Sequence, residues 1–356
     1  MEENNCISAI LFKWYNTHKR DLPWRNTRDP YRIWISEIIL QQTRIIQGLD
    51  YYNRFINRFP DIKTLANATE EEVLKYWEGL GYYSRARNIH ATAKTIMEQH
   101  DGIFPDNYNE LLKLKGIGEY TAAAISSFAW NLPYPAIDGN VFRFLSRLYA
   151  IDDPIDSLKG KKYFTTLAKE LMNPGNAGLF NQAIMEFGAL QCTPAAPRCN
   201  SCPFSSQCMA LTNKSIDRYP VKKSRVKTKD LFLNYFHIFD DENLLLYKRN
   251  EKRIWKNLFE FPLIESETAL TFDELTQQTT FKSWFPPQKS YDFKCIISHK
   301  KHILSHRILY VNFYQVYIKD GIINKADNFI KIKAEEIDQY PFHRLMMHYI
   351  ESEIKK

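Results

Sequence analysis

The stretch 111-LLKLKGIGEYTAAAISSFA-129 decides the fold of the N-terminal half of this chain. Apolar residues recur at helical spacing on both sides of Gly116 and Gly118, which predicts two helices joined by a tight turn. Both glycines can take positive φ and expose backbone N–H groups at the start of the second helix, where a phosphate oxygen binds favourably. A Gly-x-Gly turn is equally compatible with an ordinary helix-helix connection, so the surrounding sequence has to decide between the two.

Helical spacing of apolar residues extends from residue 8 to residue 190, with short polar, Gly or Pro breaks. Asp29 and Pro30 fit an N-cap followed by proline at the first helical position, which opens a helix with isoleucines at 35, 38 and 39. The N-terminal half is therefore expected to be all-helical. Further helices are predicted over residues 70–77, 84–98, 141–149, 161–172 and 181–190.

From about residue 231 the apolar period changes to two. Runs rich in aliphatic and aromatic residues predict strands over 231–239, 244–247, 295–298 and 308–317. At 356 residues the chain is long enough for two domains. We expect a helical domain over 1–213, a basic connector over 214–228 and an α+β domain over 229–356.

The net charge of +7 is concentrated in one segment. Residues 214–230 hold seven Lys or Arg against two Asp, so this segment alone contributes +5. These basic residues either solvate an exposed linker or contact the phosphates of a nucleic acid, and charge alone leaves both readings open. No apolar stretch is long enough to span a bilayer and no charged and apolar leader begins the chain, which predicts a soluble cytoplasmic protein without a membrane partner.

Four of the six cysteines fall within 17 positions, separated by six, two and five residues. In a chain without an export signal such a group is more typical of metal binding than of disulfides. A structural zinc ion is one alternative, but zinc ribbons usually have two CxxC pairs and only Cys199 and Cys202 form one here. The compact spacing favours a four-iron cluster held by Cys192, Cys199, Cys202 and Cys208.

Two acidic residues also stand out. Asp138 precedes an amphipathic run that begins at Val141, where an N-cap role explains it, although the helix dipole also keeps such a carboxylate ionised and able to face a cation. Glu37 lies on a helix with apolar residues at 35, 38, 39 and 40. A lone glutamate on a helix is usually solvated, but these neighbours favour burial, which raises a carboxyl pKa and retains a proton at neutral pH.

The helical hairpin, the carboxylate that follows it and the cysteine intervals resemble the helix-hairpin-helix domain and cluster loop of the endonuclease III superfamily of DNA glycosylases. Within that superfamily the chain is similar to adenine DNA glycosylases of the MutY type over nearly all of residues 8–213. The similarity also rests on LPWR at 22–25, SEIILQQT at 36–43 and GLGYYSRARN at 79–88. It implies one structural [4Fe-4S] cluster per chain, with Arg198 of the cluster loop offered to DNA.

The resemblance implies a reaction as well, the hydrolysis of the N-glycosidic bond of adenine opposite 8-oxoguanine or guanine in double-stranded DNA. Glu37 would protonate a flipped adenine, and Asp138 would stabilise the oxocarbenium-like sugar. A monomer is expected. The other implied site residues are Tyr120 and Asn140 beside the reacting centre, Gln42 and Tyr82 in the base stack, Gly116 and Gly118 at a phosphate, and Arg20, Leu22, Trp24, Arg25 and Gln182 around the adenine.

Position 120 distinguishes neighbouring activities within the superfamily. Members that also cut the strand carry a lysine there, which forms a Schiff base with the sugar. This chain has Tyr120, and Phe142 stands where some relatives have another lysine. A monofunctional glycosylase is therefore expected. The alternatives are an endonuclease III-like lyase on oxidised pyrimidines and a non-catalytic iron-sulfur protein that binds DNA, which would not need both Glu37 and Asp138.

Residues 229–356 resemble the Nudix-like 8-oxoguanine recognition domain of this family more loosely. The stretch WKNLFEFP at 255–262 matches one of its elements, but a Nudix box is missing, so pyrophosphate hydrolysis is not expected. Ser305 and His306 are expected near the oxidised guanine, whereas Leu304 replaces an aromatic residue and cannot stack as one would. His299, His302 and His306 suggest solvated loop residues rather than a metal site.

Overall fold

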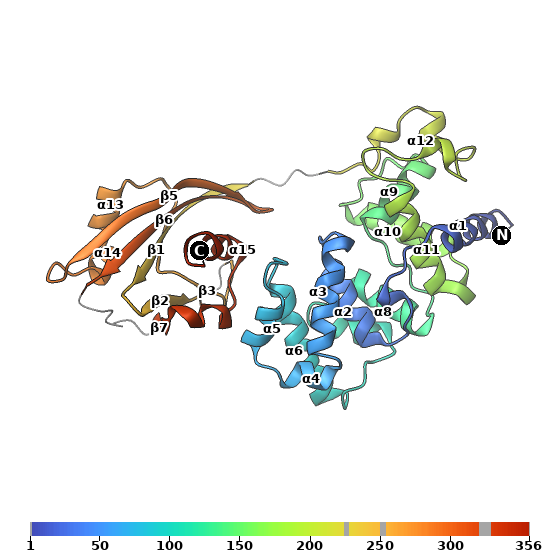
Figure 1. Ribbon diagram of the computed structural model, residues 1–356. Coiled ribbons are helices and arrows are strands. Elements are labelled where there is room, and N and C mark those ends of the chain that lie inside the picture. The colour runs from blue at the N-terminus through green and yellow to red at the C-terminus, as the bar shows by residue number, and fades with distance from the viewer. Residues whose placement is uncertain (1, 224–227, 250–253, 320–328, 356) are drawn as a thin grey trace. The chain divides into compact units, whose positions relative to one another are not determined.

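The computed structural model describes residues 2–223, 228–249, 254–319 and 329–355 (Figure 1). The chain divides into two compact units, which we call unit 1 (Met1–Asn67 with Asn88–Arg225) and unit 2 (Ala68–Arg87 with Val226–Lys356). The sequence does not anticipate the grouping of Ala68–Arg87 with the C-terminal half. The expected domain limits stay a prediction, and residues 224–227 of the expected connector lie outside the described residues.

Unit 1 is helical, as the apolar spacing predicts. Its main core is formed by fully buried side chains such as Leu11, Phe164 and Phe187, together with Phe204 from the cysteine-rich loop. Its helices are α1 (Glu2–His18), α2 (Pro30–Leu40), α3 (Ile45–Arg58), α4 (Ile62–Asn67), most of α6 (Ser84–Gln99), α7 (Tyr108–Lys113), α8 (Glu119–Trp130), α9 (Gly139–Leu148), α10 (Leu158–Leu171), α11 (Ala177–Leu190) and α12 (Met209–Thr212).

Capping residues fix the helix ends that matter for the site. The Asp29 side chain accepts from the Tyr31 backbone N–H and Pro30 opens α2, as expected. In the turn between α7 and α8, Gly116 has φ +81°, and a Cβ there would lie 2.7 Å from Cβ of Asn88. The expectation of positive φ is wrong for Gly118, which has φ −95° because it is the extended N-cap of α8.

Unit 2 is a mixed sheet with flanking helices, in agreement with the period-two pattern. Its described strands follow the order β3-β2-β1-β6-β5, with β4 paired to β1 and β7 paired to β2. β1 and β6 are parallel, and the other pairs are antiparallel. The strands are β1 (Lys229–Phe239), β2 (Asn243–Lys248), β3 (Phe259–Glu260), β4 (Leu263–Ser266), β5 (Tyr291–Ile303), β6 (Arg307–Ile318) and β7 (Phe329–Lys333).

The two faces of the sheet pack against different helices. Leu233 and Tyr235 of β1 face α15 (Arg344–Glu353), whereas Phe236 and Ile238 face α13 (Phe272–Gln277) and α14 (Thr279–Trp284). Side chains alternate between the faces of a strand, so β1 contributes to both cores. Unit 2 also contains α5 (Glu70–Tyr76). Within the described ranges, no helix combines the length and the apolar character needed to cross a lipid bilayer.

Candidate active site

A cavity of about 660 Å³ in unit 1 brings together residues from α2, α8, α11 and the start of α9. Gly116 and Gly118 of the hairpin do not line it. Ten residues singled out from the sequence do line it, although they come from distant parts of the chain: Arg20, Leu22, Trp24, Arg25, Glu37, Gln42, Tyr120, Asp138, Asn140 and Gln182.

Glu37 projects from α2 and is only 6% exposed. The Tyr120 hydroxyl on α8 donates to its Oε2 atom at 2.7 Å. Burial raises the pKa of Glu37 to about 7, although the hydrogen bond from Tyr120 opposes this shift by stabilising the carboxylate. The group therefore exchanges its proton near neutral pH, as general acid catalysis requires.

Asp138 caps α9 and faces the same cavity. Its Oδ1 atom accepts from the backbone N–H groups of Asn140 and Val141, each at 2.9 Å, and its Oδ2 atom accepts from Nδ2 of Asn140 at 2.6 Å. Burial raises the pKa of Asp138 above its ordinary value, while these three donors oppose that shift. Capping and a cavity-facing position are thus combined in one side chain.

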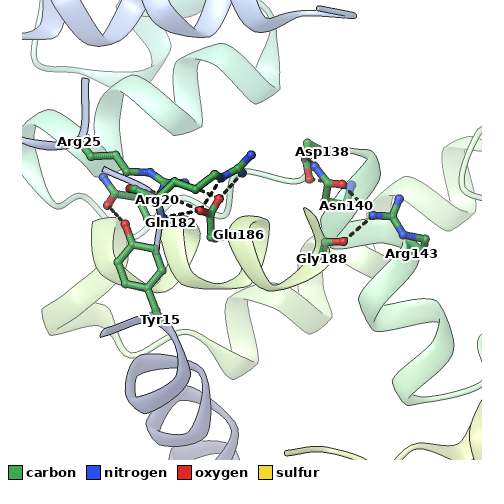
Figure 2. Close-up of polar contacts among 9 residues, drawn as sticks. All are labelled: Tyr15, Arg20, Arg25, Asp138, Asn140, Arg143, Gln182, Glu186 and Gly188. Carbon is green, nitrogen blue, oxygen red and sulfur yellow. Dashed lines mark hydrogen bonds and ion pairs between the residues drawn. The ribbon is translucent and has the colours of Figure 1, made fainter. Parts of the chain in front are cut away.

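Arg143 holds this cap in place, a role that was not predicted from the sequence. Its guanidinium Nη2 donates to Oδ1 of Asn140 at 2.8 Å and to the Gly188 carbonyl at 2.6 Å, as Figure 2 shows. Its Nε donates to the Cys192 carbonyl at 2.7 Å. Arg143 therefore joins the cap of α9 to the end of α11 and to the first cysteine. Its place three residues after Asn140 on one helix is the only sequence signal of this role.

Glu186 on α11 is a second site residue that the sequence analysis missed. It accepts paired hydrogen bonds from Arg20, at 2.8 and 2.5 Å, and from Arg25, at 2.9 and 2.6 Å (Figure 2). Burial alone would raise the pKa of Glu186, but the two guanidinium groups outweigh it and lower the pKa to about 2. A single carboxylate within the apolar run from Phe180 to Phe187 was the available signal.

Arg20 and Arg25 are held by this carboxylate at the wall of the cavity. Gln182, one turn before Glu186, accepts from the Tyr15 hydroxyl at 2.8 Å. Paired guanidinium-carboxylate bonds fix the planes of both partners, so these polar groups are positioned before any ligand enters. The arrangement can present donors and acceptors to a planar, nitrogen-rich ring between apolar walls.

The residues expected in a base stack lie on exposed turns. Gln42 follows α2 with φ +58° and is exposed at the rim of the cavity. Tyr82, in unit 2, has φ +48° and is 44% exposed, and its hydroxyl contacts the Ser305 hydroxyl. Ser305 and His306 form the exposed turn between β5 and β6, which is closed by a 2.8 Å bond from the Leu304 N–H to the Arg307 carbonyl. Leu304 packs against the core of unit 2 instead of projecting from the turn.

Cys192, Cys199, Cys202 and Cys208 line one small cavity of about 30 Å³ with Phe144, Phe187 and Phe204. Among the described residues no three His, Cys, Asp or Glu side chains converge closely enough for a single metal ion. Burial and the neighbouring sulfurs raise the pKa of Cys202 to about 11, so this thiol needs a cationic partner to ionise near neutral pH. Four soft sulfur donors around one small cavity fit a four-iron cluster. Arg198 of this loop is exposed.

The helical fold is that of a class of DNA repair proteins: residues 35–174 match the model of the HhH-GPD superfamily base excision DNA repair protein. Residues 234–352 match that of the NUDIX domain. The chain is 37% identical to the adenine DNA glycosylase of Buchnera aphidicola subsp. Acyrthosiphon pisum over 311 residues, which are 86% of this chain and 85% of the relative. It belongs to the adenine DNA glycosylase family.

Other comparisons agree with this assignment. The adenine DNA glycosylase of Buchnera aphidicola subsp. Baizongia pistaciae is also 37% identical, over 90% of this chain and 87% of the relative. Among solved structures, a thermostable thymine-DNA glycosylase superposes with a TM-score of 0.55 at 28% identity and covers 60% of this chain and 98% of its own.

Proposed function

We propose that this protein is a monomeric, base-flipping glycosylase that removes adenine paired with 8-oxoguanine or guanine in double-stranded DNA. The observation that carries the proposal is the presence of Glu37 and Asp138 in one cavity, with the pKa of Glu37 raised to about 7. Membership of the adenine DNA glycosylase family supports adenine as the excised base. The opposite base, 8-oxoguanine or guanine, is carried over from the resemblance to adenine DNA glycosylases of the MutY type.

In this mechanism Glu37 and Asp138 act on opposite ends of the breaking bond. Glu37 donates a proton to a ring nitrogen of adenine, so that the base leaves with the electron pair of the glycosidic bond. The Asp138 carboxylate stabilises the positive charge that develops on the sugar, and water completes the hydrolysis. Tyr120 and Asn140 orient the two carboxyl groups through the bonds described above. None of the described residues that line the cavity is a lysine, which supports base removal without strand cleavage.

The remaining contacts with DNA and with the cofactor are proposed from where each residue lies in the structure. Arg20, Leu22, Trp24, Arg25 and Gln182 surround the flipped adenine. Gln42 and Tyr82 enter the base stack from exposed turns, Gly116 and Gly118 offer backbone N–H groups to a phosphate, and Ser305 and His306 contact the opposite base. The four cysteines would hold a [4Fe-4S] cluster, which would cross-link the loop of residues 192–208 and so support DNA binding.

A single-turnover assay tests the proposal. Duplexes with adenine opposite 8-oxoguanine, guanine or thymine are incubated with excess protein, and abasic sites are revealed by alkali. Glu37→Gln should slow adenine release by roughly 10²- to 10⁴-fold, because it removes the general acid, while DNA affinity is retained. Glu119→Gln, an exposed glutamate beside Tyr120, is the matched control. Undiminished release by Glu37→Gln, or no release by the wild-type protein, refutes the assignment.

Metal analysis tests the cofactor separately. Purified protein should contain about four iron and four acid-labile sulfide atoms per chain, and Cys202→Ala should lower both together with DNA affinity. Cys295→Ala, the exposed cysteine of β5, should leave both unchanged. One zinc ion per chain would instead support the tetrahedral alternative.

A further inference from the structure

We propose that Glu78 and Tyr83 are positioning residues that hold Tyr82 in register with Ser305, and that discrimination of the base opposite adenine depends on them. The inference rests on the proposed function and adds a specificity device to it. Neither Glu78 nor Tyr83 lines the active-site cavity. Both belong to unit 2, in the short segment Ala68–Arg87 that groups with the C-terminal half.

Both side chains bind one short backbone segment, residues 340–342, which we call the strap. The Glu78 carboxylate accepts from the Phe342 N–H at 2.8 Å, and the Tyr83 hydroxyl donates to the Phe342 carbonyl at 3.0 Å. Lys75 donates to the Tyr340 carbonyl at 3.0 Å and pairs with Glu78 at 2.8 Å. Three side chains from residues 75–83 therefore bind backbone polar groups of the strap.

The strap is itself fixed to the sheet of unit 2. The Phe259 N–H on β3 donates to the Pro341 carbonyl at 2.9 Å. Phe342 is 3% exposed and belongs to the sheet core. The next residue, His343, is fully buried and caps α15. Because these neighbours are buried, the strap cannot shift without disturbing the core.

Tyr82 lies between two attachments. On the first side, the Tyr83 hydroxyl accepts a hydrogen bond from the Gly79 N–H at 3.2 Å, in the turn that precedes Tyr82. The same hydroxyl donates to the strap, so it joins this turn to the strap. The Tyr82 hydroxyl contacts Ser305 on the β5–β6 turn. The φ of +48° at Tyr82 is unfavourable for an aromatic residue, so the surrounding bonds must hold it. These bonds hold the exposed Tyr82 ring and Ser305 next to each other on the surface of unit 2.

Recognition of the base opposite adenine depends on the exact placement of Tyr82 relative to Ser305. 8-Oxoguanine differs from guanine only at the C8 and N7 edge of the ring, so discrimination depends on a few hydrogen bonds of correct length. A stacked ring that is displaced by a fraction of an ångström would misplace that edge relative to Ser305. Release of adenine opposite guanine does not use those contacts and should be much less sensitive.

Removing single polar atoms tests the inference. Tyr83→Phe and Glu78→Ala should each lower the ratio of adenine release rates opposite 8-oxoguanine and opposite guanine by about tenfold, the effect of losing one well-formed hydrogen bond. The rate opposite guanine should stay within about twofold of the wild type. Glu78→Gln should largely retain the ratio, because its amide oxygen still accepts from the Phe342 N–H.

Two further measurements separate positioning from a general structural role. 2-Aminopurine placed beside 8-oxoguanine should report less unstacking by Tyr82 in Tyr83→Phe, while the melting temperature stays near that of the wild type. Glu71→Gln, which breaks the exposed pair between Glu71 and Lys248 of the same unit, is the matched control and should leave the ratio unchanged.

The outcomes distinguish the two proposals. An unchanged ratio in both Tyr83→Phe and Glu78→Ala overturns the positioning role, as does an equal fall of both rates together with a lower melting temperature. A wild-type protein that releases adenine from neither duplex overturns the proposed function instead.

Discussion

Burial raises the pKa of both Glu37 and Asp138, but the two carboxyl groups differ in the hydrogen bonds that they accept. Glu37 is buried on a largely apolar helix with a single hydrogen bond from Tyr120, so its neutral form is favoured. Asp138 sits at a helix N-terminus and accepts three hydrogen bonds, which stabilise its carboxylate and oppose the rise in its pKa that burial causes. One cavity thus holds two carboxyl groups with different hydrogen bonding, and the one with fewer donors, Glu37, is the better proton donor.

The pH profile of adenine release should be bell-shaped, because Glu37 must be protonated and Asp138 ionised. The alkaline limb should lie near the Glu37 pKa of about 7. Tyr120→Phe removes a hydrogen bond that lowers this pKa, so the pKa rises and the alkaline limb should move to higher pH. Single-turnover rates across a pH series measure the shift.

Tyr15→Phe is the control for that experiment, because it loses a hydroxyl bonded to Gln182 rather than to Glu37. Its alkaline limb should coincide with that of the wild type. A limb that moves to lower pH in Tyr120→Phe would contradict the assignment of Glu37 as the acid.

Among individual residues, the sequence predicted those whose role is indicated by their immediate sequence neighbours. Asp138 was found because a cap precedes an amphipathic run, and Glu37 because isoleucines surround it on one helix. Glu186 was missed because its partner Arg20 lies 166 residues away. Arg143 was missed because, apart from Asn140 three residues before it, it binds backbone as distant as that of Cys192, 49 residues away, and no local pattern encodes such pairs.

Among the elements, α9 and α11 approach closely at one glycine. A Cβ on Gly188 would lie 2.6 Å from the Asn140 carbonyl oxygen and 2.8 Å from the Asn140 side chain. Gly188 therefore permits the contact through which Arg143 holds the cap of α9.

Gly188→Ala should lower the free energy of unfolding by about 1–3 kcal/mol, because backbone atoms rather than a flexible side chain must move. Adenine release should slow as Asn140 is displaced. Urea titration measures the first effect and single-turnover kinetics the second. Gly175→Ala, where a Cβ meets only Oδ1 of Asn173 at 3.4 Å, should unfold like the wild type. Equal stability of the two variants would contradict this account of the contact.

Element boundaries were predicted less well than element types. α10 begins at Leu158 rather than at 161, because the Ser157 side chain caps the Gly160 N–H. β5 runs from Tyr291 to Ile303, well beyond the expected 295–298. Its outer residues, including Lys300 and Lys301, are polar and exposed, and pairing with β6 rather than apolar alternation makes them a strand.

The stability of the whole molecule should depend on pH because unit 2 contains buried histidines. His237 on β1 is stacked between Phe239 and Phe261, and burial lowers its pKa to about 3. Burial also lowers the pKa of His343. Between the ordinary histidine pKa of 6.5 and the folded value, the unfolded chain binds more protons, so stability falls as pH falls.

At about pH 5 the His237 contribution to this loss should approach roughly 2 kcal/mol relative to neutral pH. His237→Phe should remove it, since phenylalanine fits among the same rings and does not titrate. Urea titrations of the full chain at neutral and acidic pH measure the difference. His348→Gln, an exposed histidine on α15, should keep the wild-type dependence, and an unchanged dependence in His237→Phe would rule out His237 as the source.

The unbroken pairing of β1 with β6 has a consequence for how this sequence can diversify. Eleven residues pair in parallel from Lys229 with Arg307 to Phe239 with Tyr317, and β1 supplies both cores of unit 2. A one-residue insertion within β1 would exchange its side chains between the two cores. β5 already contains register shifts after Cys295 and Ile297. Insertions and deletions inherited over evolutionary time should therefore collect in β5 and in the loops, and β1 should keep its length.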